Sequence, residues 1–508
     1  MTRRRRATAS LAVASCGALI AACGGPTSGT PDVAPAQAPR PNVLLIVADD
    51  LGWTDLGHAG SGYYETPRLD ALAAEGLRFT DAYANSANCA PTRAALMSGL
   101  HAARTGVYTV GSGARGSAER RLLVPPPNRT ALDADFVTLA ERLQAQGYRT
   151  GFVGKWHLGS AEQRLLPEDQ GFDFAVGGDQ QGHPPSHFYP YRRGERGLPG
   201  LSPPGLGGTI GDPARSGEYL TDRITEEALR FLDGDQGHPW FLVVSHYAVH
   251  TPIQAPEAAV ARFRDKPPVG GHADPTYAAM VARLDASVGA LLDRLEQDGE
   301  ARDTLVLFTS DNGGLGGYRE AGVPGSPEKT SNAPLRGGKG MFSEGGIRVP
   351  LLAYWPGRVP AGAVCAEPVQ LFDLYPTLVA LAGGEAQAPL PLPDDADATV
   401  APDGADLSAL LRDPATGLAR EAVYFHFPGY LESGRNSWRT TPVSVVRAGP
   451  WKLLEYHEDG HVELYRLDHD LGETQDLSTA QPERAAELRA RLHAWLQATD
   501  APMPSQPH

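Results

Sequence analysis

Cysteine is scarce in this chain, with four residues among 508. Cys16 and Cys23 lie close to the N-terminus and Cys89 belongs to a short motif, so that Cys365 alone is left over. The sequence therefore predicts no structural disulfide, even in a compartment that permits one. Positive charge is also in the minority, since 45 Lys and Arg face 60 Asp and Glu for a net charge of −15. This balance argues against a nucleic acid as partner.

A long apolar run is missing at the N-terminus, where four consecutive Arg at 3–6 precede an Ala-rich run at 11–22. That run is too short to anchor the protein across a bilayer and is typical of an export signal. It ends in Leu-Ile-Ala-Ala-Cys-Gly at 19–24, which resembles the bacterial lipoprotein box, in which Cys23 becomes the lipidated first residue. An ordinary cleaved signal followed by an unrelated Cys is the alternative.

We therefore predict a signal peptide at 1–22 and a flexible tether at 23–40, which is rich in Pro, Gly, Ala and Thr. The protein would be exported to the cell envelope, as a periplasmic or cell-surface lipoprotein that meets the membrane only through its lipid anchor. The paired arginines leave both the general secretory and the twin-arginine export routes open.

Continuous apolar runs, typical of strands buried on both faces, lie at 42–48, 150–154, 240–246 and 304–310. Helical patterns lie between them at 69–75 and at 276–297, the second preceded by Asp274 and Pro275. Strands that alternate with helices predict an α/β fold with a large, mainly parallel central sheet flanked by helices. We place this domain at 41–382.

The pattern changes after a Pro-, Ala- and Asp-rich stretch at 383–406, which we predict to be a linker or loop. Short strand patterns at 443–446, 451–456 and 462–465 are separated by turns, and an amphipathic helix follows at 482–499. Residues 407–508 therefore predict a small C-terminal α+β subdomain, with an antiparallel sheet and a helix.

Polar side chains follow two of the predicted buried strands: Asp49 and Asp50 end the first, and Asp311 and Asn312 end a late one. Open α/β sheets bind ligands at the carboxyl ends of their strands. Carboxylate and amide oxygens favour a hard divalent cation such as Ca²⁺ or Mg²⁺. Either pair alone is equally typical of a turn or a helix cap, but both pairs at strand ends favour a metal site.

The stretch Cys89-Ala-Pro-Thr-Arg93 precedes a predicted helix. A helix N-terminus favours anions, both a thiolate and a bound oxyanion. A buried structural Cys near a loop Pro is the alternative. Cationic candidates that could join it are Arg93, Lys155, His157, His250 and Lys339. Each alone is as typical of an ordinary surface or core residue, whereas together they would supply the positive site that an acidic protein needs for an anionic ester.

From about Pro41 to the C-terminus the chain resembles the type I sulfatases of the alkaline phosphatase superfamily. The resemblance rests on five separated motifs in the family's order, at 42–56, 89–106, 154–159, 310–314 and 335–350. It implies an alkaline phosphatase-like fold and a sulfuric ester hydrolase that acts on a sulfated carbohydrate or an aryl sulfate.

The resemblance also implies roles for single residues. Cys89 would be converted by a formylglycine-generating enzyme, which reads Pro91 and Arg93, into formylglycine, whose hydrate is the nucleophile. The metal, Ca²⁺ in preference to Mg²⁺, would be bound by Asp49, Asp50, Asp311, Asn312 and the modified Cys89. Arg93 would hold the diol, and Lys155 and His157 would contact its hydroxyls. His250 would protonate the leaving oxygen, and Lys339 would bind the sulfate.

Two competing functions remain at this point. One is another hydrolase of the superfamily, a phosphatase, phosphodiesterase or phosphonate hydrolase, most of which use Ser or Thr as nucleophile. Cys89 in its motif favours sulfate over these. The other is a non-catalytic surface lipoprotein that binds glycans, and the full set of expected catalytic groups argues against it.

Two aromatic and His-rich stretches, 182–191 and 424–428, resemble the pocket-lining loops of bacterial enzymes that act on sulfated sugars. Aromatic and imidazole side chains there would stack on a sugar and hydrogen-bond to it. His183 and His426 are the candidates for substrate binding, and purely structural loops are the alternative. The sequence does not give the sugar, the sulfated position, endo or exo action, or the oligomeric state.

Overall fold

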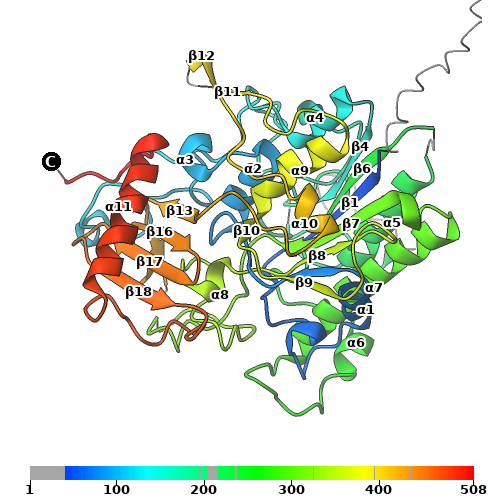
Figure 1. Ribbon diagram of the computed structural model, residues 1–508. Helices are drawn as coiled ribbons and strands as arrows, with labels where there is room; N and C mark the ends of the chain where they lie inside the picture. The colour runs from blue at the N-terminus through cyan, green and yellow to red at the C-terminus, as the bar shows by residue number, and fades with distance from the viewer. Residues whose placement is uncertain are drawn as a thin grey trace, which may run out of the picture. The chain divides into compact units, whose positions relative to one another are not determined.

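The buried strand β1 (Asn42–Ala48) lies inside an eight-stranded sheet in the computed structural model (Figure 1). The structure describes residues 40–194, 196–202, 215–234, 237–323, 325–393, 395–433 and 437–507. The predicted signal peptide, the lipidation candidate Cys23 and the tether up to residue 39 lie outside these ranges. The chain from Arg40 onward is a single unit.

The predicted large, mainly parallel sheet is confirmed. Its order is β5-β4-β6-β1-β7-β8-β2-β9, and β8 runs antiparallel to both of its neighbours. Besides β1 the strands are β2 (Leu77–Phe79), β4 (Arg149–Gly154), β5 (Phe174–Val176), β6 (Trp240–Ser245), β7 (Thr304–Ser310), β8 (Leu351–Tyr354) and β9 (Ala363–Cys365).

Helices cover both faces of this sheet, as the apolar runs predict. Alternate residues of β1 point to opposite faces: Val43, Leu45 and Val47 join one core, and Leu44 and Ile46 join the other. The first core contains α2 (Cys89–Ser98), α4 (Leu139–Ala145) and α9 (Leu374–Leu381). The second contains α1 (Pro67–Glu75), α5 (Leu220–Leu232) and α7 (Pro275–Gln297).

The start of α7 follows the predicted signal. The Asp274 carboxylate accepts hydrogen bonds from the backbone N–H groups of Thr276 (2.9 Å) and Tyr277 (3.1 Å), and Pro275 occupies the first helical turn, where no donor is needed. The N-terminus of α7 is therefore fixed, and it lies beside the end of β1, where the Tyr277 hydroxyl donates to the carbonyl of Asp50.

The C-terminal antiparallel sheet and helix are confirmed as well. Strands β13 (Val423–Phe427), β16 (Val443–Ala448), β17 (Trp451–Tyr456) and β18 (Val462–Arg466) pair in that order. Helix α11 (Pro482–Ala498) packs on one face, where Leu488 and Leu492 meet Leu453. The other face packs through Phe425 on residues of the α/β part, including Tyr83.

The segment expected to be a linker or loop, 383–406, contains a two-stranded antiparallel ribbon, β11 (Leu390–Leu392) with β12 (Asp395–Val400). Its end is tied to the body, because the Asp403 carboxylate accepts from the backbone of His101 (2.8 Å) and pairs with Arg104 (3.1 Å). The domain boundaries at 382 and 406 stay predictions.

The smaller elements connect these parts. The short helices are α3 (Ala102–Thr105), α6 (Glu257–Ala261), α8 (Glu344–Ile347) and α10 (Ser408–Arg412). Two further strand pairs are β3 (Ala82–Tyr83) with β10 (Val369–Gln370) and β14 (Leu431–Glu432) with β15 (Trp438–Thr440). Within the described ranges, none of the helices combines the length and the apolarity needed to cross a membrane.

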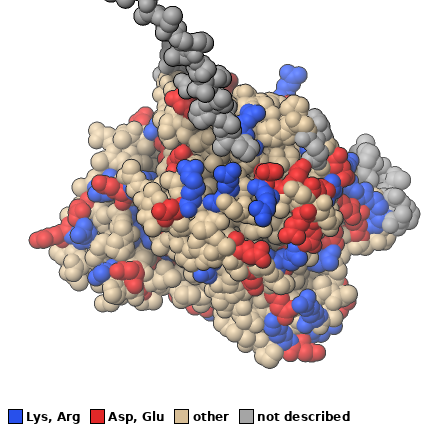
Figure 2. All heavy atoms as spheres, turned by 45° about the vertical axis from the view of Figure 1, so that its right-hand side comes forward, with Lys and Arg blue, Asp and Glu red and all other residues tan. Residues whose placement is uncertain are grey.

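The surface mixes both signs of charge. Figure 2 shows basic and acidic side chains interspersed over the face that it presents. Ion pairs account for part of this pattern, such as Arg294 of α7 with Asp233 at the end of α5 (2.8 Å) and with Asp298 at the end of α7 itself (2.6 Å). Such exposed pairs contribute little to stability.

A buried ionic cluster joins the C-terminal sheet to the α/β part. Lys452 of β17 is fully buried and lies 2.9 Å from Glu344 of α8 and 2.8 Å from Glu473. Arg348 pairs with Glu344 at 2.7 Å. Burial alone would raise the pKa of Glu344, but Lys452 and Arg348 hold it well below its usual range. The cluster therefore contributes only while each charge keeps its partner.

Replacing Lys452 by Met should destabilise the protein strongly, because it leaves two buried carboxylates without their shared cation. We expect a loss of about 3–5 kcal/mol in the free energy of unfolding, measured by urea denaturation. The loss should shrink as the pH falls, since protonation removes the unpaired charge. Arg484→Met, which breaks an exposed pair with Glu487, is the control. Equal stability of the two variants would contradict the assignment.

Candidate active site

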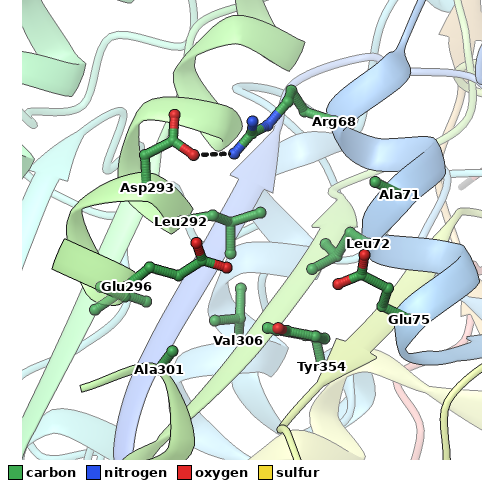
Figure 3. A pocket seen from close by; sticks show the side chains of 11 residues that line it. Arg68, Ala71, Leu72, Glu75, Leu292, Asp293, Glu296, Ala301, Val306 and Tyr354 are labelled. Atoms are coloured by element: carbon green, nitrogen blue, oxygen red, sulfur yellow. Dashed lines mark hydrogen bonds and ion pairs between the residues drawn. The ribbon is translucent and has the colours of Figure 1, made fainter. Parts of the chain in front are cut away.

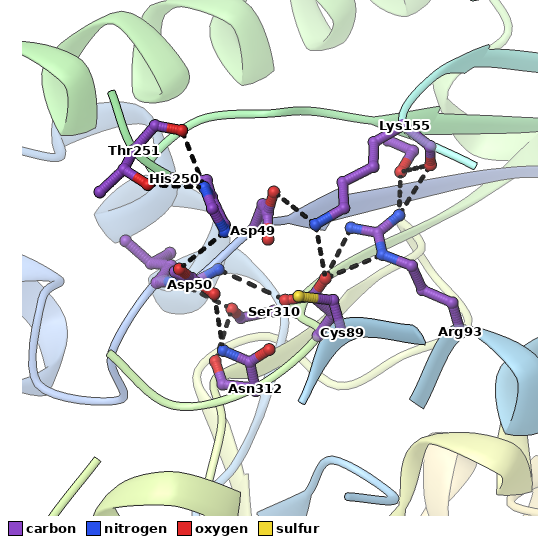
Figure 4. Close-up of polar contacts among 12 residues, drawn as sticks. Asp49, Asp50, Cys89, Arg93, Lys155, His250, Thr251, Ser310 and Asn312 are labelled. Carbon is purple, nitrogen blue, oxygen red and sulfur yellow. Dashed lines mark hydrogen bonds and ion pairs between the residues drawn. The ribbon is translucent and has the colours of Figure 1, made fainter. Parts of the chain in front are cut away.

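Two neighbouring strands carry the four predicted oxygen ligands. Asp49 and Asp50 follow β1, and Asp311 and Asn312 follow β7. The parallel register between these strands ends at the pair Ala48–Ser310, so all four side chains meet at one edge of the sheet. The Asn312 amide donates to Asp50 Oδ1 (2.8 Å), and the Asp50 backbone donates to Asp311 Oδ1 (3.3 Å). Figure 4 shows this convergence.

Cys89 is the first residue of α2 and is 2% exposed. Ligand atoms of Cys89, Asp49, Asp50 and His250 all lie within 4.8 Å of one another. Burial raises the pKa of the Cys89 thiol to about 11, although the nearby Lys155 and Lys339 act in the opposite direction. Burial thus outweighs the helix N-terminus, and the side chain as encoded is a neutral thiol rather than the thiolate that a helix start favours.

Each of the three carboxylates has its own cation. Arg93, one turn beyond Cys89 in α2, donates to Asp311 Oδ2 through Nε (2.8 Å). Lys155, directly after β4, lies 2.7 Å from Asp49 Oδ2. The third cation, Lys339, lies 2.6 Å from Asp50 Oδ1 and 3.4 Å from Cys89 Sγ.

Two buried oxygens in this cluster have no hydrogen-bond partner among the described residues: Asp49 Oδ1 and Asn312 Oδ1. Burial raises the pKa of Asp49 to about 8, even though Lys155 lowers it. Buried polar atoms without partners need an explanation, and a divalent cation accounts for both observations. The donor set consists of oxygens, which fits a hard cation.

Two histidines complete the inner site. His157 follows Lys155 in the loop after β4, and burial together with Lys155 lowers its pKa well below the usual range. His250 follows β6; its Nδ1 donates to the carbonyl of Thr251 (2.8 Å), which leaves Nε2 to face Asp50 Oδ2 at 3.5 Å. Burial and then Lys339 lower the pKa of His250 well below its usual range. An anion in the site would act against Lys339 and favour protonated His250.

These groups open into a pocket of about 190 Å³. Of the predicted residues, Cys89, His157, His183, His250 and Lys339 line it. The exposed His183 ring stacks on that of His250, with centroids 5.9 Å apart. Arg93, Lys155 and the oxygen ligands lie beneath its floor.

His426 lies elsewhere, so the structure contradicts its predicted place at the substrate. It belongs to β13 and is 2% exposed. Its ring nitrogens lie 2.8 Å from Ser444 Oγ and 3.0 Å from the carbonyl of Pro502. The aromatic stretch 424–428 is a core strand whose apolar and aromatic residues pack inward, which explains the misleading pattern.

A second pocket lies between α1 and α7 (Figure 3). It is lined by Arg68, which pairs with Asp293, and by Glu75, Glu296 and Tyr354. None of the predicted site residues lines it. It therefore has no part in the site built around Cys89.

Sequence reasoning missed Ser245 in the inner site and two arginines of the outer pocket. Ser245 ends β6, accepts from Arg93 Nη1 (2.6 Å) and donates to the carbonyl of Lys155 (2.7 Å), so it fixes two cations. Its position at the end of a buried strand, close to the signal that identified Asp49, could have revealed it. Arg115 and Arg439 line the outer pocket, and their loop and strand sequences carry no comparable signal.

Comparison with known proteins agrees with this geometry. The sulfatase family model matches residues 41–384, and the model of the C-terminal part of N-sulphoglucosamine sulphohydrolase matches residues 338–501. A sulfatase of Formosa agariphila is 33% identical over 528 residues, which cover 91% of this chain and 90% of that protein. Arylsulfatase A of Bos taurus is 36% identical over 440 residues, or 82% and 75% of the two chains.

Among solved structures, Ps i-CgsB in complex with k-i-k-neocarrahexaose is similar, with a TM-score of 0.69 and 29% identity over 90% of this chain and 92% of that one. These matches decide between the functions left open by the sequence. They favour the sulfatase, and the protein is a sulfuric ester hydrolase. With its alkaline phosphatase-like fold, the chain belongs to the sulfatase family.

Proposed function

We propose that this sulfatase removes sulfate from a sulfated carbohydrate or an aryl sulfate, with residue 89 acting as formylglycine. The observation that carries the proposal is the meeting of Cys89 with Lys339, 3.4 Å away, above a buried cluster of carboxylates. The names of the relatives support the substrate class, since they include arylsulfatase A and N-acetylgalactosamine-6-sulfatase.

The chemistry of residue 89 favours modification. A thiol with a pKa of about 11 is a poor nucleophile at neutral pH. Hydrated formylglycine would supply one hydroxyl that attacks sulfur as the alcohol leaves. Deprotonation of its second hydroxyl would re-form the aldehyde as the carbon–oxygen bond to sulfate breaks, and water would then restore the hydrate. This role requires a formylglycine-generating enzyme as a partner during synthesis. Pro91 and Arg93 are the residues of this chain that it would read.

We assign a divalent cation, Ca²⁺ in preference to Mg²⁺, to Asp49, Asp50, Asp311 and Asn312 together with residue 89. The unpartnered Asp49 Oδ1 and Asn312 Oδ1 support this assignment. Such a cation supplies positive charge against the oxygens of the sulfate ester. Burial of all four donors favours Ca²⁺, because Mg²⁺ usually keeps several waters.

The remaining residues of the site each act on a defined atom. Lys339 Nζ, at the pocket floor, binds the sulfate oxygens and offsets the charge of the anionic ester. Arg93 and Lys155 hold the carboxylates and the residue 89 side chain in place. His157 contacts the hydroxyls at residue 89, and His183 contacts the substrate beyond the ester.

His250 is the proton donor to the leaving oxygen. Its Nδ1–H bond to Thr251 fixes Nε2 toward the pocket. A bound sulfate anion favours the protonated ring, opposite to the effect of Lys339 on its pKa. An anionic ester in the site therefore favours the protonated form of the ring that donates to its leaving oxygen.

The place of action that fits this chemistry is the cell envelope. We propose that residues 1–22 direct export and that Cys23 carries a lipid anchor, with the catalytic domain at 41–382 and the C-terminal subdomain at 407–508. A tethered enzyme at the cell surface or in the periplasm would meet sulfated glycans that do not enter the cytoplasm. Globomycin-sensitive maturation and labelling of Cys23 by a fatty acid would test the anchor.

Active protein should contain formylglycine at position 89. Protein made in a host with the converting enzyme is digested with trypsin, and the peptide with residue 89 is identified by mass spectrometry. Cys89→Ala should abolish turnover of sulfate esters, whereas Cys365→Ala, which removes the other buried thiol, should retain it. A free thiol at residue 89 in fully active enzyme would overturn the proposal.

Asp311→Asn should abolish activity and lower the metal content, because it removes a charged ligand but keeps an acceptor for Arg93. Elemental analysis should find one Ca²⁺ per wild-type chain and less in the variant. Asp285→Asn is the control, since that buried carboxylate lies outside the site and accepts from the backbone of Arg68 and Leu69 at the start of α1. Activity that depends on bound zinc would contradict the calcium assignment.

His250→Ala should slow the release of poor leaving groups most. A sugar alkoxide needs a proton and nitrophenolate does not, so we expect a loss of about a hundred- to ten-thousand-fold on a sulfated sugar and a distinctly smaller loss on nitrophenyl sulfate. Steady-state kinetics on the two substrates measures the difference. Equal losses would show that His250 positions the substrate and does not donate the proton.

A further inference from the structure

The outer part of the pocket carries positive charge beyond that of the proposed sulfate site. Three cations line the pocket: Lys339, Arg115 and Arg439. Lys339 is neutralised by Asp50. The described partners of Arg439 are neutral, namely the carbonyl of Lys339 (3.3 Å) and Ser326 Oγ (3.2 Å).

The guanidinium of Arg439 is held in place, but not all of its N–H groups have an acceptor among the described residues. It lies over the ring of Tyr318, 4.5 Å from the ring centroid. Tyr318 is fully buried, and its hydroxyl donates to the carbonyl of Lys339 (2.8 Å), which ties Arg439 to the loop of the sulfate-binding Lys. Arg439 Nε is buried and has no hydrogen-bond partner among the described residues.

Arg115 lies beside Arg439 from another part of the chain. Its described hydrogen bonds go to the backbone carbonyls of Ser112 and Val110, and its side chain is exposed. Partial desolvation and the neighbouring Arg439 lower the pKa of Arg115, as expected for two cations held near each other, although Glu432 acts in the opposite direction. Two like charges at one pocket wall are unfavourable unless an anion lies between them.

The carboxylate among the described lining residues is not an anion bound between Arg115 and Arg439. Glu432 is the acidic residue among the described lining residues, and it pairs with Arg120 (3.1 Å) outside the pocket. Glu432 acts on Arg115 as well, but one carboxylate shared with Arg120 does not balance both Arg115 and Arg439, so this wall of the pocket is positive.

We propose that Arg115 and Arg439 form a second anion-binding subsite, which takes a carboxylate or a second sulfate of the same substrate. The inference rests on the proposed function, since it concerns the substrate whose sulfate ester is cleaved at residue 89. A guanidinium donates parallel N–H groups that match carboxylate and sulfate oxygens alike. The natural substrate is then a sugar that carries an anionic group besides the sulfate that is removed.

The test compares substrates that differ in their second charge. The probes are nitrophenyl sulfate, a monosulfated neutral sugar, the same sugar with a second sulfate, and a sulfated uronic acid. The disulfated sugar and the sulfated uronic acid distinguish a second sulfate from a carboxylate. The wild-type enzyme should have the lower KM for the substrate whose second anion the subsite binds. The enzyme is the full chain with formylglycine at residue 89.

Arg439→Ala and Arg115→Ala should each raise the KM for the preferred doubly anionic sugar on the order of tenfold, as expected for a lost hydrogen bond to a charged group. The KM for nitrophenyl sulfate should stay about the same. Arg439→Lys keeps the charge but loses the fork, so its KM should lie between those of the wild type and the Ala variant. Arg358→Ala is the matched control, because Arg358 also lies over an aromatic ring, Trp355, but does not line the pocket.

Three results would overturn the inference. One is an equal KM of the wild-type enzyme for neutral and doubly anionic sugars. Another is a rise in KM that is the same for nitrophenyl sulfate as for the doubly anionic sugar, because that indicates damage to the sulfate site. The third is inactivity of the converted wild-type enzyme on every sulfate ester, which would overturn the proposed function and this inference with it. Arg115 is exposed, so its variant should fold even if Arg439→Ala does not.

Discussion

The fold depends on how three buried carboxylates are paired with cations at the end of two neighbouring strands. Asp49, Asp50 and Asp311 are crowded at the edge where β1 and β7 end, and a different cation pairs with each of them. An unpaired charge at such depth would cost several kcal/mol. The cations come from α2, from the loop after β4 and from the loop before α8, so this balance of charge fixes segments distant in sequence around the sheet.

Much of this architecture could be predicted because local signals and packing agree. The runs at 42–48 and 304–310 are apolar on both faces, and such residues are stable only between two layers of helices. The polar pairs that follow them had to meet, since carboxyl ends of adjacent parallel strands share an edge. The start of α7 carried its own cap in Asp274.

What could not be predicted depends on long-range packing. Strand β8 runs against its neighbours, and nothing in four residues of apolar sequence encodes direction. The Pro- and Asp-rich segment at 383–406 gave no sign that Asp403 would bind the start of α3. His426 lies in an aromatic stretch like that of His183, yet only one of them borders the pocket. The proximity of Arg115 and Arg439 likewise arises from tertiary structure.

Two groups of structural elements form the pocket and its surroundings, and they differ in how well they tolerate substitution. The strand ends and α2 lie beneath the pocket, where Arg93, Lys155 and Lys339 pair with buried carboxylates, so that a substitution there disturbs its partner as well. Part of its wall comes from the small ribbon β14–β15, through Leu431 and Arg439. That ribbon is a separate pair of strands and is not part of the central sheet. Selectivity could therefore diverge between related enzymes by exchange of this ribbon, while the chemistry beneath it is inherited unchanged.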